Sequence, residues 1–259
     1  MTLLGAYVRG HHETLWSGGL VTLLGELGFS TAAARAALTR FARRDLLARV
    51  RRGRQIHYRL TERTERVLAE GDRRIFALGT ETQAPETWTA LWHDIPERQR
   101  LERGRLARRL RFLGFGTLRD GLWIAPGDRE RELLPLLGEL GVEARCELLV
   151  GRLAGAPGST ALVRQAWDLD ALAARYRAFT DEFGPFARRR GAPRLDDAAA
   201  FRVRTRVLHR YRGFPFLDPG LPDALMPDPR ARPRAVAVFA RAYAALQPPA
   251  QRHFDGVMG

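Results

Sequence analysis

The sequence predicts an α+β protein made of three consecutive parts, residues 1–78, 86–155 and 161–259. The first part combines helical segments with an arginine-rich strand pair, and the second alternates strands with helices. The third is helical and is interrupted by prolines. Two polar stretches that contain Gly and Pro, at 79–86 and 154–160, have the composition of linkers between the parts.

The charge of the chain points to a polyanionic partner. Its 259 residues carry 43 Lys plus Arg against 29 Asp plus Glu, a formal net charge of +14. All 43 are arginine, which a GC-rich genome favours over lysine, although such a genome does not explain the excess of base over acid. The position of the charge along the chain is therefore more informative than its total.

The single cysteine and the apolar runs indicate the environment of the protein. Cys146 allows no intrachain disulfide, which fits a reducing cytoplasm, and its neighbours CELLV indicate a structural thiol rather than a nucleophile. No apolar run approaches the ~20 residues that span a bilayer, and MTLLGAYVRGHHE does not resemble a secretory signal. We therefore expect a cytoplasmic protein without a membrane partner.

The first part has the pattern of a helix-turn-helix. After a short helix over 3–9, a helix over 18–27 ends at Gly28, and Ser30 is placed to cap the next helix. That third helix has an apolar face made of Ala34, Leu38 and Phe41, with Leu46 and Leu47 just beyond it. Its opposite face carries Thr31, Arg35, Thr39, Arg40 and Arg43. In a helix-turn-helix, the helix after the turn enters the DNA major groove, where arginine can bridge guanine O6 and N7.

A basic hairpin follows the third helix directly. LLARVR and QIHYRL alternate apolar and polar residues, and Arg52-Gly53-Arg54 turns between them. As the wing of a winged helix-turn-helix, this hairpin would place Arg52 and Arg54 on phosphates beside the groove. Residues 1–75 hold fourteen Arg against seven acids, a local net charge of +7 and half of the total. The alternative is a solvated arginine face on a small helical domain.

The middle part has the element order of a ferredoxin-like domain. After a connecting helix over 62–78, we expect a strand at 87–95, a helix at 96–114, a hairpin at 115–126 that turns at Arg119-Asp120-Gly121, a helix at 128–140 and a strand at 142–153. This β-α-β-β-α-β order defines the ferredoxin-like arrangement. The helix from Glu97 to Arg111 holds seven Arg and two Glu. It could be solvated, pair with another subunit or lie on DNA, and we favour the first two.

Asp94 raises an alternative function. It ends the first strand of the middle part, where small ferredoxin-like nucleases carry a metal-binding aspartate. A Mg²⁺-dependent phosphodiesterase gathers several carboxylates. The next acids, Glu97 and Glu102, lie on the following helix, and no second strand-end carboxylate is evident apart from the turn residue Asp120. The competing interpretation is that Asp94 caps the helix that starts at Pro96. We predict no metal site and no cofactor otherwise.

The third part is predicted to be helical. One helix covers 167–183, with Leu169, Leu172, Tyr176 and Phe179 at helical spacing, and others cover 198–214 and 233–246. The proline-rich stretch 216–229 lies between the last two, and we expect the tail 247–259 to be partly disordered.

Three stretches of the chain resemble PaaX-type transcriptional repressors, the regulators of phenylacetate catabolism. They are GFSTAAARAALTRFARRDLL with its wing RRGRQIHYRL, IPERQRLERGRLARRLRFLGFGTLRDGLWIAP, and LHRYRGFPFLDPGLPDALMP. The first occurs in many winged helices, whereas the second and third are specific to the family. The resemblance implies a dimeric, cytoplasmic repressor that binds a palindromic operator in double-stranded DNA. It also implies release from DNA by an aryl-acyl-CoA effector, which is phenylacetyl-CoA in the best-known members.

The resemblance carries over by position with two departures. Arg35, Arg40 and Arg43 match the family's base-reading helix, and Arg52 and Arg54 match its wing. Phe41 and Asp45-Leu46-Leu47 stand where the family has a leucine and Gly-Trp-Leu. In the regulatory part, Asp228-Pro229-Arg230-Ala231 replaces a tryptophan-glycine element.

We predict a ligand-responsive repressor and no enzyme, because the chain has no Gly-rich phosphate loop, Cys/His metal spacing or nucleophile elbow. A metal-dependent nuclease centred on Asp94 and a basic scaffold without sequence preference are the alternatives. Arginines would hold a CoA phosphate and an apolar wall its aryl group. Candidate effector-binding residues are Arg210, Tyr211 and Arg212, beside Phe214 and Phe216, although packing of that loop explains them equally well.

Overall fold

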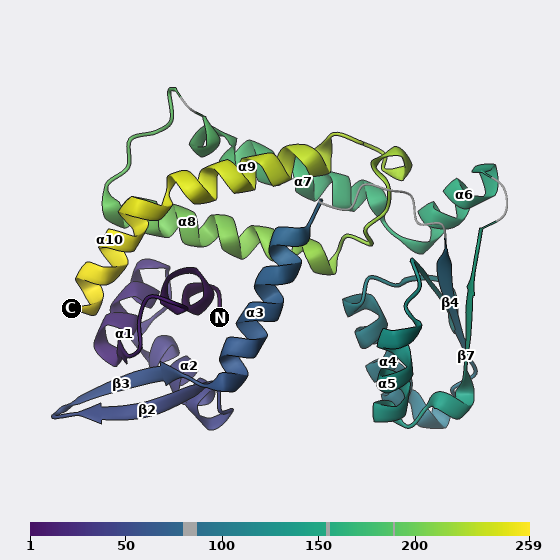
Figure 1. Ribbon diagram of the computed structural model, residues 1–259, viewed down its shortest axis with the longest axis horizontal. Helices are drawn as coiled ribbons and strands as arrows, with labels where there is room; N and C mark the ends of the chain where they lie inside the picture. The colour runs from purple at the N-terminus through teal and green to yellow at the C-terminus, as the bar shows by residue number, and fades with distance from the viewer. Residues whose placement is uncertain (80–86, 154–155, 189) are drawn as a thin grey trace. The chain divides into compact units, whose positions relative to one another are not determined.

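The computed structural model confirms a mixed α and β protein (Figure 1). It describes residues 1–79, 87–153, 156–188 and 190–259. Contacts divide the chain into two compact units. Unit 1 comprises Met1–Phe76, Phe179–Arg212 and Ala237–Gly259, and unit 2 comprises Ala77–Ala178 and Gly213–Val236. The domain boundaries expected from the sequence (1–78, 86–155 and 161–259) stay a prediction.

Unit 1 begins with helices and a three-stranded antiparallel sheet. Its elements in chain order are η1 (Leu4–Val8), β1 (Leu15–Trp16), α1 (Ser17–Glu26), α2 (Thr31–Arg43), β2 (Leu47–Arg52), β3 (Gln55–Leu60) and α3 (Glu62–Ala77). The sheet order is β1-β3-β2. The two-residue strand β1 was not expected, and it pairs Leu15 with Tyr58 and Trp16 with His57. Such a short strand carries no periodic signal of its own, so only the partner strand defines it.

The third helix of this unit ends before Leu46 and Leu47, the two leucines that follow its apolar face. α2 stops at Arg43, and Asp45 has a φ of 54°, in the left-handed region. Aspartate tolerates this conformation better than most residues with a side chain, which accounts for Asp45 at the position where the resembling family has glycine. The chain then enters β2, where Leu47 is buried.

The chain's C-terminal helices complete unit 1. α8 (Asp197–Tyr211) is capped by Asp196, whose Oδ1 accepts a hydrogen bond from the Ala199 amide at 2.6 Å. The expectation of a partly disordered tail was wrong, because residues 247–259 form α10 (Gln247–Met258), which packs on α8 and α1 (Figure 1). Ala250 and Phe254 of α10 are fully buried, and tertiary burial therefore orders this segment.

An arginine without a carboxylate partner lies in the core of unit 1. Arg204 of α8 is 3% exposed, and its guanidinium lies 3.8 Å from the Tyr243 ring centroid and 5.0 Å from that of Tyr7. It donates to the Ala6 carbonyl at 3.1 Å and the Tyr243 carbonyl at 3.2 Å. No carboxylate in the described residues lies within ion-pair distance of Arg204. Two aromatic faces and two carbonyls therefore stabilise the charge.

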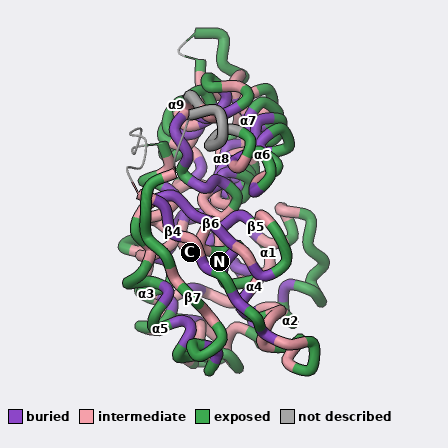
Figure 2. The backbone as a smooth tube through the Cα atoms, turned by 90° about the vertical axis from the view of Figure 1, so that its right-hand side faces the viewer, coloured by how far each residue is buried: buried purple, intermediate pink, exposed green. Residues whose placement is uncertain are grey.

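Unit 2 contains the β-α-β-β-α-β order expected of the middle part. Its elements are β4 (Trp88–His93), η2 (Glu97–Gln99), α4 (Arg100–Phe112), β5 (Gly116–Arg119), β6 (Leu122–Pro126), α5 (Glu130–Leu140), η3 (Glu143–Arg145) and β7 (Cys146–Gly151). The antiparallel sheet has the order β5-β6-β4-β7. β4 and β6 are mostly buried, whereas the edge strand β7 is mostly exposed (Figure 2). Leu91 of the sheet packs with Leu106, Leu110 and Leu133 of the helices in the core.

The linker predictions have different outcomes. Most of the first linker, 80–86, and residues 154–155 of the second lie outside the described residues. The linker expectation was wrong for 156–160, because α6 (Ala156–Ala166) begins there. Further elements are α7 (Leu169–Phe183), η4 (Gly184–Ala187), η5 (Phe214–Phe216), η6 (Asp223–Leu225) and α9 (Ala231–Ala245). Among the described residues, no helix combines the length and apolar character needed to cross a bilayer.

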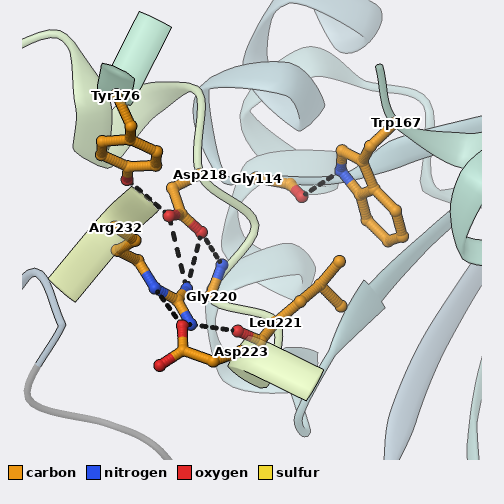
Figure 3. A network of polar contacts seen from close by, with 8 residues as sticks. All are labelled: Gly114, Trp167, Tyr176, Asp218, Gly220, Leu221, Asp223 and Arg232. Atoms are coloured by element: carbon orange, nitrogen blue, oxygen red, sulfur yellow. Dashed lines mark hydrogen bonds and ion pairs between the residues drawn. The ribbon is translucent and has the colours of Figure 1, made fainter. Parts of the chain in front are cut away.

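A buried polar network holds the proline-rich loop of unit 2 (Figure 3). Arg232, 3% exposed, donates to Asp218 Oδ1 at 3.2 Å and to Asp223 Oδ1 at 2.6 Å. Asp218 also accepts a hydrogen bond from the Tyr176 hydroxyl at 2.6 Å and one from the Gly220 amide at 2.8 Å. The two aspartates of FLDPGLPDALMP therefore neutralise one buried arginine, so both have a structural role in this motif.

Burial determines the chemistry of the single thiol. Cys146 of β7 is half-buried and pairs with His93 across the sheet. Burial raises the pKa of the Cys146 thiol to about 11, and the carboxylates of Asp94, Glu143 and Glu147 add to this shift. At neutral pH the group is a protonated thiol, as a structural cysteine requires.

Replacing Arg232 with methionine should destabilise the protein by about 3–5 kcal/mol, because Asp218 would keep a buried charge without its partner. The free energy of unfolding in urea measures this change. Arg241→Met, an exposed arginine on the same helix, is the control and should change it by less than about 0.5 kcal/mol. Equal effects of the two substitutions would contradict a structural role of the network.

Alkylation of Cys146 with iodoacetamide should be slow at pH 8 and should accelerate with a midpoint near the pKa of about 11. The reason is that only the thiolate reacts, and its fraction at pH 8 is about a hundredfold smaller than at the ordinary thiol pKa. Mass spectrometry of the intact chain follows the reaction without ambiguity, since the sequence has one cysteine. A midpoint near 8.5–9, the range of an exposed thiol, would show that the environment does not raise this pKa.

Candidate nucleic-acid interface

Local hydrogen bonds and burial fix the orientation of α2. The Ser30 Oγ accepts a hydrogen bond from the Ala33 amide at 3.2 Å, which confirms that Ser30 caps α2 as predicted. Gly28, in the turn between α1 and α2, has a φ of 90°, which favours glycine. Ala34 and Leu38 are buried against the unit. The opposite side of the helix therefore faces outward.

The structure places the predicted α2 residues on this outward side. Exposed residues on it are Thr31, Arg35, Thr39, Arg40 and Arg43. Thr39 Oγ1 donates back to the Arg35 carbonyl at 3.0 Å, so its hydroxyl proton is already used within the helix. Alanines at 32, 33 and 36 are also exposed. Their small side chains let another surface come close to the helix backbone.

The β2–β3 hairpin extends beyond α2 and carries the other predicted residues (Figure 1). Arg52 pairs with Gln55, and Gly53 and Arg54 form the two-residue loop between them. Gly53 has a φ of 60° while Arg54 does not have a positive φ, a pattern that fits a type II′ turn. Arg52 and Arg54 are exposed at the tip. Arg51 Nε donates to the Gly53 carbonyl at 3.2 Å and supports the turn.

The arginines of α2 and of the hairpin tip lack carboxylate partners. Within the described ranges, no ion pair involves Arg35, Arg40, Arg43, Arg52 or Arg54. Two acids of this unit contact arginines elsewhere: Asp72 pairs with Arg9 at 2.5 Å, and Glu70 pairs with Arg74 at 2.9 Å. No described carboxylate therefore neutralises the positive charge of these five arginines.

Sequence reasoning omitted several similar arginines, among them Arg44 and Arg51. Arg44, just after α2, and Arg51, on the hairpin, are exposed and also make no ion pair with a described residue. The signal was in the sequence, since both lie in adjacent arginine pairs, ARRD and VRRG. They enlarge the basic surface of this unit.

The predicted effector residues all make contacts within unit 1. Tyr211 is 1% exposed, and its ring lies parallel to Phe239 with 3.7 Å between centroids. Arg210 pairs with Glu182 at 3.3 Å, and Arg212 donates to Thr2 Oγ1 at 2.7 Å. Their role in ligand binding stays a prediction.

The surroundings of Asp94 do not favour a metal-dependent nuclease. Asp94 is exposed, and its Oδ2 lies 3.8 Å from an Arg145 nitrogen. In the part of the chain that the structure describes, no three His, Cys, Asp or Glu side chains are grouped as a metal site requires. The capping interpretation of Asp94 was wrong, because Pro96 occupies the cap of η2 and no side chain bonds there.

Comparison with known proteins identifies the family. Residues 1–64 match a PaaX-like protein model, residues 81–163 the PaaX protein central Cas2-like domain, and residues 167–256 the PaaX-like protein C-terminal domain. The chain is 28% identical to the transcriptional repressor PaaX of Escherichia coli over 238 residues, 87% of this chain and 72% of that protein. It also resembles the solved structure of the uncharacterized protein Rv0674 from Mycobacterium tuberculosis, with a TM-score of 0.58 and 25% identity over 98% of this chain and 96% of that one. Three successive family domains thus account for nearly the whole sequence, and the chain belongs to the PaaX family.

Proposed function

We propose that this protein is a cytoplasmic transcriptional repressor that binds operator DNA through a winged helix-turn-helix and is released by an aryl-acyl-CoA. The observation that carries the proposal is the outward face of α2, whose arginines make no ion pair with any described residue. The similarity to the Escherichia coli repressor supports the same role. The alternative of a nuclease is not favoured, and the family relationship indicates a regulator rather than an enzyme.

In this proposal α2 enters the major groove and reads bases. Arg35, Arg40 and Arg43 would approach base edges, and arginine bridges O6 and N7 of guanine with two hydrogen bonds. The exposed alanines of α2 allow the close approach that this requires. Arg52 and Arg54 would contact phosphates from the hairpin, which acts as the wing.

A dimer on a palindromic operator explains how an effector could release the protein. Two copies would place two α2 helices in half-sites about one helical turn apart. An aryl-acyl-CoA that favours a different dimer geometry would remove this match and shift the population away from DNA. Arg210, Tyr211 and Arg212 are the residues that we propose for effector binding. Wild-type affinity for phenylacetyl-CoA in both Arg210→Ala and Arg212→Ala would exclude the two arginines from that site.

The proposal is tested by fluorescence anisotropy at fixed salt. The labelled duplex comes from the region upstream of the protein's own gene, and a scrambled duplex of equal length competes with it. We expect preferential binding that phenylacetyl-CoA abolishes and that free phenylacetate or coenzyme A does not. Equal affinity for both duplexes would argue for a basic scaffold, and specific binding that ignores the thioester would reject the effector.

Arg40→Ala should weaken operator binding by about 1–3 kcal/mol and relax sequence preference, because a base contact is lost. Titration of operator duplexes with single base changes measures both effects. Arg66→Ala, which removes an exposed arginine from α3, is the charge-matched control. If both variants keep the wild-type preference, Arg40 does not read bases.

Arg52→Ala should reduce affinity for every duplex and lower the slope of log K against log salt by about one, since one phosphate contact is lost. The ratio between operator and scrambled affinities should stay the same. Binding isotherms between ~50 and ~200 mM salt give the slope. A slope equal to that of wild type would rule out a phosphate contact at this position.

A further inference from the structure

Helix α4 of unit 2 carries a second basic surface that the proposed function does not use. The segment from Glu97 to Arg111, which includes η2, holds seven arginines and two glutamates. The structure divides these arginines into two groups with different surroundings, and the division suggests different roles.

The first group is held by neighbouring side chains within unit 2. Arg103 pairs with Glu97 at 2.7 Å, and Arg109 pairs with Glu139 of α5 at 3.7 Å. The guanidinium of Arg111 lies 5.3 Å from the Trp123 ring centroid. These three arginines therefore have partners in their own domain.

The second group has no such partners among the residues that the structure describes. We call Arg100, Arg105 and Arg108, together with Arg98 of the preceding η2, the outer arginines of α4. All four are exposed, and none forms an ion pair with a carboxylate of the described chain. Leu106 and Leu110, which are fully buried, define the opposite side of the helix. Arg105 and Arg108 are three residues apart and so lie side by side on the outward face.

This arrangement fits a polyanion better than a second copy of the helix. Two α4 helices packed on their outer faces would bring the arginines of one against those of the other, and the partly buried Glu102, one turn from Arg105, would compensate only a fraction of that charge. Phosphate groups would instead accept paired hydrogen bonds from each guanidinium. Leu101, 68% exposed, lies one turn from Arg105 on the same side and adds no charge to it.

We propose that the outer arginines of α4 bind a second set of backbone phosphates on the DNA, in addition to those at the wing. The inference rests on the proposed DNA-binding function, and it assigns the middle domain a part in affinity rather than in base recognition. Base recognition stays with α2, so loss of the α4 contacts should weaken operator and scrambled duplexes by the same factor.

The test compares two double variants that remove the same charge. Arg105→Gln with Arg108→Gln removes two outer arginines, while Arg164→Gln with Arg175→Gln removes two exposed arginines from other helices of unit 2. Affinity for operator and scrambled duplexes is measured against salt. The α4 variant should lower the slope of log K against log salt by about two, since each phosphate contact contributes ~0.9, and the control should keep the wild-type slope.

A wild-type slope in the α4 variant, or an equal change in the control, would overturn the inference. Coenzyme A binding is measured in parallel, because its phosphates have the same chemistry. Loss of coenzyme A binding with an unchanged DNA slope would assign the surface to a small ligand and reject DNA. The ratio of operator to scrambled affinity reports on the proposed function separately: a wild-type ratio of one would refute that function even if the α4 slope changed.

Discussion

The buried charge of Arg204 is the constraint on which the rest of unit 1 depends. Without a carboxylate partner among the described residues, this charge is stabilised only if Tyr7, from the start of the chain, and Tyr243, from α9, enclose it. The N-terminal segment and the C-terminal helices must therefore fold as one body. Tyr7 also stacks on Phe254 of α10, with 5.1 Å between ring centroids, and His253 of α10 pairs with Glu26 of α1 at 2.8 Å.

This construction gives the proposed regulation a physical route. α1 precedes the helix that we propose to read DNA, and α10 packs directly against α1. A ligand that shifts α8 or α10 would change the support of α1, and through it the position of α2. The arginines of the helix that we propose to read DNA are exposed on the side of α2 opposite Ala34 and Leu38, which are buried in the core.

Sequence patterns predicted the elements that have local signals. The Ser30 cap, the alternation of the hairpin and the apolar spacing of α2 depend on neighbouring residues, and the structure contains all three. α10 was missed because its order comes from burial of Phe254 against distant helices. The apolar face of α2 correctly predicted that the candidate residues opposite it are exposed. The sequence did not predict which arginines lack an ion pair with a described residue. Pairs such as Arg9 with Asp72, or Arg109 with Glu139, join residues far apart in sequence and could be found only in the structure.

Site-directed cleavage tests most directly whether α2 lies in the major groove of the operator. A cysteine at the exposed position Ala36, introduced with Cys146→Ser, would carry an iron–EDTA group, and Ala174→Cys on α7 in the same background is the control. We expect operator cleavage confined to two short stretches about one helical turn apart, seen with the α2 label and not with the control. Dispersed cleavage, or none, from a labelled protein that still binds the operator would contradict it.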